Sequence, residues 1–144
     1  EKGPLPAMYY ADTAVVVVNP EVSSVRDSDR ILGLLDSKTR KAENGETLKP
    51  HLLLTRYSPS RVEGGEMLSI KDVEEVLGLK TLGVIPESGD VLNASNKGEP
   101  VILDLESNAG QAYDDAVGRL LGEDRPLRFT TVEKKGFFTK LFGG

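Results

Sequence analysis

The sequence predicts an α/β fold built on a mostly parallel, doubly wound sheet, and two features of the chain indicate it. Three short apolar runs, TAVVVV at 13–18, HLLLT at 51–55 and TLGVIP at 81–86, lack polar alternation. Such runs are typical of strands that are covered on both faces, as in parallel sheets. Segments with helical periodicity lie between and after them, and this order implies right-handed crossovers between parallel strands.

Two of the predicted helices carry both a start signal and an apolar stripe. The first follows the strand at 13–18 and has Ser23 or Ser24 as its N-cap. The second has Ser69 as N-cap, an acidic residue three positions later that completes a capping box, and Gly78 as its stop. The apolar stripes of the two helices consist of Val25, Ile31, Leu32 and Leu35, and of Ile70, Val73, Val76 and Leu77.

A third helix is predicted from Ala109 to Leu121, with Gly122 at its end. The connections at 41–50 and 56–67 are polar, so we expect surface loops there. The residues of the third helix that we expect to face inward are Ala112, Tyr113, Ala116, Val117, Leu120 and Leu121.

Composition bounds the possible functions. The chain has 144 residues, of which 38% are hydrophobic, so it can form one domain with a core. A net charge of −5 argues against a general nucleic-acid binder, and the lack of cysteine excludes disulfides and thiolate chemistry. The longest apolar run, Ala14 to Val18, is too short to span a bilayer, and EKGPLPAMYY does not resemble a secretory signal. We therefore expect a cytoplasmic protein.

The C-terminal segment differs in charge from the rest of the chain. Arg128, three lysines and Glu133 give residues 128–144 a net charge of +3, whereas the remainder of the −5 chain carries −8. The same segment holds three of the four phenylalanines. A basic and aromatic end on an acidic domain indicates a local function.

On a helix with about 100° of rotation per residue, the segment is amphipathic. Phe137, Phe138, Leu141 and Phe142 fall within an arc of roughly 140°, and Lys140 lies on the other side. Lys134 and Lys135 stand one turn earlier, where their ammonium groups can reach anionic headgroups. A single short helix of this kind binds weakly, whereas two on one particle bind well. A terminal helix packed onto its own domain is the alternative.

Three further stretches have both a functional and an ordinary interpretation. PEVSSVRDSDR at 20–30 is either a solvated helix face or a partner-binding helix. Arg56, Pro86 and Glu87 follow predicted strands, at the sheet edge where ligands bind in open α/β folds, yet they also fit ordinary loops. His51 opens a strand at the opposite end and has no partners for a catalytic triad, so we expect a structural role.

Several segments together resemble the C-terminal half of the MinD branch of the ParA-like, deviant Walker A P-loop ATPases. They are ADTAVVVVNPEVSSVRDSDRILGLL, HLLLTRYSPSRV, LGVIPESGDVLNASNKGEPVILD and the terminal EKKGFFTKLFGG. The resemblance implies an ATPase that uses ATP and Mg²⁺, forms a homodimer in the ATP state and regulates placement of the division septum. It also implies MinC and MinE as partners, and a peripheral location on the inner face of the bacterial cell membrane.

The resemblance also implies roles for particular residues. Arg56, Pro86 and Glu87 match base-contacting loops of the nucleotide pocket. The residues that match the partner-binding surface are Glu21, Ser23, Asp27 and Asp29. The residues that match the membrane-targeting motif are Lys134, Lys135, Phe137, Phe138, Lys140, Leu141 and Phe142.

The chain is expected to be a fragment: residues 1–127 match the later part of the ATPase domain, and residues 128–144 match a linker and membrane helix. The sequence holds no G-x-x-x-x-G-K-[ST] phosphate loop, and RVEGGEM at 61–67 is expected to be a flexible turn. We therefore expect no catalytic or metal-binding residues, no ATP hydrolysis by this chain alone, and an open edge on its sheet. The alternative is a non-catalytic, membrane-attached adaptor. A receiver-like domain is disfavoured because the predicted strand ends carry no cluster of aspartates.

Overall fold

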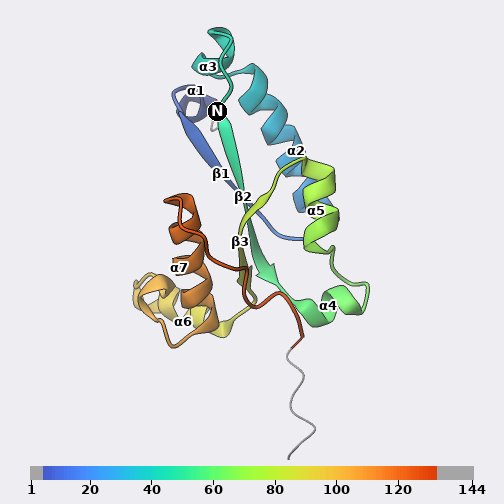
Figure 1. Ribbon diagram of the computed structural model, residues 1–144, viewed down its shortest axis with the longest axis vertical. Helices are drawn as coiled ribbons and strands as arrows, with labels where there is room; N and C mark the ends of the chain where they lie inside the picture. Colours follow the sequence, from blue (N-terminus) through green and yellow to red (C-terminus); the bar gives the residue numbers. More distant parts are fainter. Residues whose placement is uncertain (1–4, 133–144) are drawn as a thin grey trace, which may run out of the picture.

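The computed structural model describes residues 5–132 and has an α/β fold with a three-stranded parallel sheet in the order β1-β2-β3 (Figure 1). The strands are β1 (Thr13–Val18), β2 (Lys49–Tyr57) and β3 (Thr81–Pro86). The predicted fold class and all three predicted strands are confirmed. The helical elements are α1 (Leu5–Tyr9), α2 (Val22–Ser37), α3 (Arg40–Glu43), α4 (Pro59–Glu63), α5 (Ile70–Leu77), α6 (Gly89–Lys97), the 3₁₀ helix η1 (Val101–Leu103) and α7 (Asn108–Leu120).

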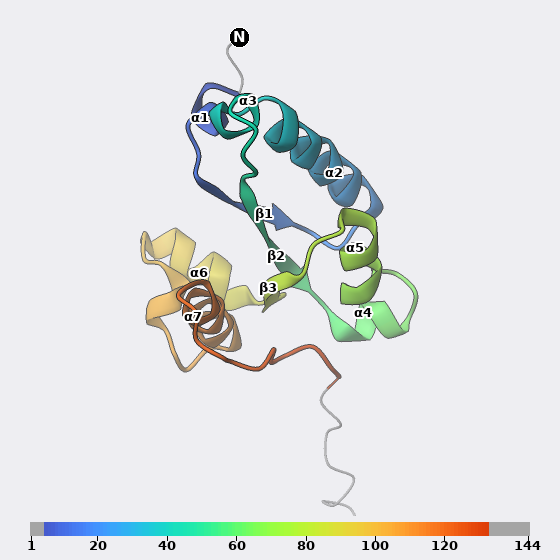
Figure 2. The ribbon, with the colours of Figure 1, turned by 45° about the horizontal axis from the view of Figure 1, so that its top comes forward.

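Helices lie on both sides of the sheet. Figure 2 shows α2 and α5 on one side and α6 and α7 on the other. On the α2 side, Leu52, Leu54 and Val73 are fully buried in the larger of two apolar clusters. The second cluster lies between β3, η1 and α7 and contains Ile85 and Val101.

The start and end of α5 are as predicted. Ser69 Oγ accepts a hydrogen bond from the Asp72 N–H at 3.1 Å, and the Asp72 carboxylate accepts one from the Ser69 N–H at 2.9 Å. A hydrogen bond from the Ser69 hydroxyl to the Asp72 carboxylate, and the one from the Ser69 N–H, hold the pKa of Asp72 below its usual range. Gly78 ends the helix in the left-handed conformation, with φ of 64°.

The predicted N-cap of α2 is wrong. The helix begins at Val22, with Glu21 as its N-cap residue and no capping bond from that side chain. Ser24 Oγ instead accepts a hydrogen bond from the Asn19 N–H at 3.1 Å, so this serine closes the turn that leads into the helix. The predicted apolar stripe of α2 faces the core as expected.

The predicted inward face of the third helix is correct only in part. In α7, Ala112 and Ala116 are buried and Tyr113 is half-buried. Val117 and Leu120 are exposed, and so is Leu121 just beyond the helix. Small residues face β3 because the helix lies too close to the strand for larger ones.

Within residues 5–132, other elements cover only one of the two faces of strand β1. Val16 and Val18 are buried, whereas Val15 and Val17 are 42% and 58% exposed. The inference that this apolar run is covered on both faces is therefore wrong for residues 5–132. The expected open edge is present there, because β1 pairs with β2 alone.

Several short helices were not predicted. The connections at 41–50 and 56–67, expected to be loops, contain the end of α3 and all of α4. Helix α6 starts after Ser88, whose hydroxyl accepts a hydrogen bond from the Asp90 N–H, and it ends at Gly98. None of its residues is fully buried, although Val91 and Ala94 pack against the second cluster.

The substitution Gly83→Ala tests the close packing of α7 on β3. A Cβ at residue 83 would lie 2.6 Å from Ala116 Cβ and 2.9 Å from Leu53 Cδ1. We expect it to lower the free energy of unfolding by about 1–3 kcal/mol, measured by urea denaturation. The control is Gly33→Ala, at an exposed position of α2. The new Cβ meets nothing within 4 Å there, so stability should not fall. Equal stability of the two variants would contradict the packing described.

Candidate functional site

A cavity of about 520 Å³ lies at the carboxyl ends of β2 and β3. Its walls come from the ends of both strands, the first half of α6 and Tyr113 of α7. The sequence-predicted residues Arg56, Pro86 and Glu87 all line it. They converge because parallel strands end at the same edge of a sheet. Their assignment to nucleotide binding stays a prediction.

The polar side of the cavity is joined to the sheet by two contacts. An Arg56 Nη2 atom lies 3.7 Å from Glu87 Oε1 in an exposed ion pair, which contributes little to stability. The Glu87 N–H donates a hydrogen bond to the Tyr57 carbonyl at 2.9 Å, and this bond fixes the turn after β3 against the end of β2.

Arg56 has an unusual backbone conformation. Its φ is 56°, in the left-handed region that a long side chain rarely adopts. It lies where the register between β2 and β3 shifts, between Leu54 and Tyr57. Non-glycine residues in this region are strained and concentrate at functional sites.

Apart from Arg56, Pro86 and Glu87, sequence reasoning missed the residues that line the cavity, among them Thr55 and Leu92. Thr55 Oγ1 donates a hydrogen bond to Asn19 Oδ1 at 3.0 Å, which links the ends of β2 and β1. Tyr113 had been assigned to the inner face of its helix but not to the cavity. Burial raises the pKa of the Tyr113 phenol, so the ring presents a neutral, mostly apolar wall.

The predicted partner-binding residues lie together at the start of α2. Glu21, Ser23, Asp27 and Asp29 are all exposed, and the first three line a groove of about 670 Å³ between α2 and β1. Among residues 5–132, no basic side chain lies within 4.0 Å of the three carboxylates.

The other predicted features lie either at a distance from the cavity or outside residues 5–132. His51 is half-buried near the start of β2, at the end opposite the cavity. In the part of the chain that the structure describes, no acidic or histidine cluster could hold a metal ion, and no helix is long and apolar enough to cross a bilayer. The predicted membrane residues, which run from Lys134 to Phe142, lie outside the described residues.

Comparison with known proteins gives close relatives. The septum site-determining protein MinD of Escherichia coli K12 is 64% identical over 145 residues, which cover 100% of this chain and 54% of that protein. The Aquifex aeolicus MinC:MinD cell division complex contains a chain with 39% identity and a TM-score of 0.79, covering 92% of this chain and 51% of that one. No family model matches.

A more distant structure shows the same fold. The septum site-determining protein MinD from Pyrococcus horikoshii, described as complexed with Mg-ADP, is 22% identical with a TM-score of 0.61. The match covers 78% of this chain and 43% of that one. The chain spans about half the length of the curated relatives that it matches. Over this C-terminal half, the chain belongs to the MinD family of septum site-determining proteins.

Proposed function

We propose that the chain is part of a MinD-like, membrane-associated ATPase that regulates division-septum placement by ATP-dependent dimerisation. Residues 1–127 then belong to its ATPase domain, and residues 128–144 are a linker and an amphipathic membrane helix. The observation that carries the proposal is the 64% identity to the Escherichia coli MinD along the whole of this chain. The parent protein uses ATP and Mg²⁺, and the chain supplies one side of its nucleotide site.

The cavity at the ends of β2 and β3 receives the adenine base in this proposal. Its volume of about 520 Å³ suits a heterocyclic ring, and its walls combine the apolar Ile85 and Tyr113 with polar groups at the rim. Arg56 and Glu87 provide a donor and an acceptor at that rim. Base recognition requires this combination of an apolar slot with a few polar groups.

The first two turns of α2 bind the partner proteins in this proposal. MinC is supported by the similarity to the Aquifex aeolicus MinC:MinD complex, and MinE by the family resemblance. Glu21, Asp27 and Asp29 are exposed carboxylates near the start of α2, and Glu21 and Asp27 line the same groove. Such a surface favours a partner with arginine or lysine at the contact.

The C-terminal segment attaches the protein to the inner face of the cell membrane. Full burial of each large apolar side chain contributes roughly 1.5–3 kcal/mol, and each lysine contributes about 1 kcal/mol near an anionic leaflet. Ordering a short helix offsets much of this gain. The affinity of one segment is therefore small, and dimerisation raises it by placing two segments on one particle.

The membrane role is tested by a pair of substitutions that add the same charge. Phe138→Glu places a carboxylate on the apolar arc of the predicted helix, whereas Thr139→Glu places it on the polar side. We expect Phe138→Glu to abolish sedimentation with anionic vesicles, and Thr139→Glu to weaken it only modestly. Binding of the wild-type chain should also fall at high salt, because the lysine contribution is screened. Equal binding by the two variants would refute insertion of the apolar face.

The 144-residue chain should release no phosphate from ATP above a protein-free control. The sequence holds no phosphate loop, so no lysine and hydroxyl are placed to hold the phosphates and Mg²⁺. The measurement is steady-state phosphate release at several protein concentrations, with a heat-denatured sample as a second control. A rate that rises in proportion to the concentration of folded chain would show the expectation to be wrong.

Substitutions at Arg56 test whether the cavity stores backbone strain. Glycine adopts φ of 56° without steric cost, whereas alanine retains the strain. Both variants remove the exposed ion pair with Glu87. We expect Arg56→Gly to exceed Arg56→Ala in free energy of unfolding by about 1 kcal/mol, measured in urea. A more stable alanine variant would argue against the strained conformation.

A further inference from the structure

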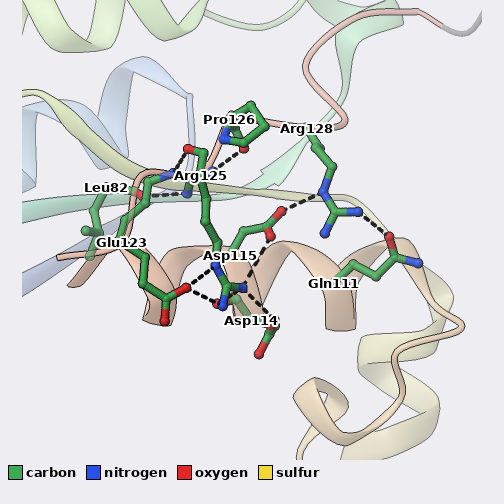
Figure 3. Close-up of polar contacts among 9 residues, drawn as sticks. Leu82, Gln111, Asp114, Asp115, Glu123, Arg125, Pro126 and Arg128 are labelled. Carbon is green, nitrogen blue, oxygen red and sulfur yellow. Dashed lines mark hydrogen bonds and ion pairs between the residues drawn. The ribbon is translucent and has the colours of Figure 1, made fainter. Parts of the chain in front are cut away.

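Residues 123–129, which we call the strap, run back along α7 after the helix ends. Figure 3 shows Arg125 and Arg128 of the strap among the polar contacts that hold it, and Arg119 of α7 contributes further hydrogen bonds. The strap precedes residues 133–144, the part of the basic C-terminal segment to which the membrane role is proposed. No sequence feature predicted these contacts.

Arg119 ties the strap backbone to the sheet. Its Nε donates a hydrogen bond to the Arg125 carbonyl at 2.8 Å, and its Nη2 donates one to the Pro126 carbonyl at 2.6 Å. Its Nη1 donates to the Leu82 carbonyl of β3 at 2.8 Å. One guanidinium thus joins three backbone carbonyls from two distant parts of the chain.

Arg125 fills a space that only a glycine in α7 leaves free. A Cβ at Gly118 would lie 2.6 Å from Arg125 Cζ and 2.9 Å from its Cδ. The guanidinium is held over this position by Asp114 Oδ2 and Glu123 Oε2, each 2.6 Å from an Nη atom. The two carboxylates raise the pKa of Arg125, so the side chain stays charged.

Arg128 pairs with a buried carboxylate. Its Nε donates to Asp115 Oδ2 and its Nη1 to Gln111 Oε1, both at 2.7 Å. Asp115 is only 7% exposed. Burial raises its pKa, but the hydrogen bond from Arg128 and the nearby arginine charges outweigh burial, and the net pKa lies below its usual range. A buried, paired carboxylate of this kind is costly to leave without its partner.

Phe129 completes the attachment. It packs against the cluster formed by Ile85, Val101, Ala109 and Ala112, and the Arg128 guanidinium lies 5.3 Å from its ring centre. Its φ is 61°, a strained conformation for a bulky residue. Such strain persists only where the surrounding contacts over-determine it. The strap is therefore held in one position, and its last fixed residue is Phe129.

We propose that the strap is a positioning clamp that fixes where the membrane segment leaves the domain. This inference rests on the proposed membrane role of residues 133–144. Lys134 follows Phe129 by five residues, so with the strap docked it can lie at most about 18 Å from Phe129. With the strap released, the last residue held by the domain is Leu121, and Lys134 can lie up to about 45 Å from it. When the strap is docked, the part of α7 around Gln111 is held close to the anionic membrane.

Two variants release the strap without changing the net charge of the chain. Gly118→Ala inserts a methyl group into the space of Arg125, and Arg128→Lys cannot bridge Asp115 and Gln111 at once. Gly33→Ala is the control, a glycine-to-alanine change on an exposed helix position far from the strap in the sequence. Circular dichroism and urea denaturation establish that each variant is folded.

The first readout needs no membrane. Chymotrypsin cleaves after Phe129, and mass spectrometry follows the appearance of fragment 1–129 under native conditions. We expect both strap variants to be cleaved there at least about threefold faster than wild type, because docking of Phe129 must open before cleavage. Gly33→Ala should be cleaved at the wild-type rate. Equal rates in all four proteins would overturn the docked strap.

The second readout measures distance to the membrane. Because the chain has no cysteine, a fluorophore can be placed at Asn108→Cys, one turn from Gln111, or at Asn44→Cys beyond α3. Vesicles of phosphatidylcholine and phosphatidylglycerol carry a nitroxide headgroup quencher. Figure 1 shows α3 at the opposite end of the molecule from the end of the strap, so the label at 44 serves as the distant control.

We expect vesicle-bound wild type to be quenched at 108 and not at 44. Release of the strap should lower quenching at 108 by about half, because the tether becomes longer, while the bound fraction measured by sedimentation stays the same. Unchanged quenching in both strap variants, with normal sedimentation, would overturn the positioning role alone. Because one segment binds weakly, sedimentation is measured over rising lipid concentration, and its absence for wild type at the highest concentration would contradict the proposed membrane function and the positioning role with it.

Discussion

The close approach of α7 to β3 determines most of what the described part of the chain can do. Residue 83 has no Cβ, so Ala116 can lie directly over the strand. At this separation, Tyr113 reaches the wall of the cavity and the Arg119 guanidinium reaches the Leu82 carbonyl. A helix held farther out would lose both contacts. The candidate nucleotide site and the strap therefore depend on the same helix position.

Elements with contiguous signals could be predicted from the sequence, and elements fixed by distant contacts could not. The bounds of α5 follow from Ser69, Asp72 and Gly78, which act within one helix. The start of α2 depends on Asn19 and on a hydrogen bond from the Leu68 N–H to the Pro20 carbonyl, from a segment far along the chain. A capping rule that considers neighbouring residues alone therefore placed the N-cap too late.

The same distinction applies to the candidate site. Arg56, Pro86 and Glu87 were found because one topological rule places the carboxyl ends of all parallel strands together. Tyr113 reaches the cavity only through the packing of α7, and Leu92 only through α6, a helix with no fully buried residue. The left-handed backbone of Arg56 carries no sequence signal, because a non-glycine residue there is held by its surroundings.

Charge pairing in the strap changes how an acidic domain meets an anionic surface. Asp114, Asp115 and Glu123 all pair with arginines within the strap and α7. Without these pairs, the carboxylates would repel anionic headgroups or attract the lysines of the C-terminal segment. With them, Arg125 and Arg128 offset two of these three carboxylate charges close to that segment, in a protein whose residues 1–127 carry −8. The arginine contacts therefore have two effects. They hold the strap in place, and they reduce the negative charge where the basic segment begins.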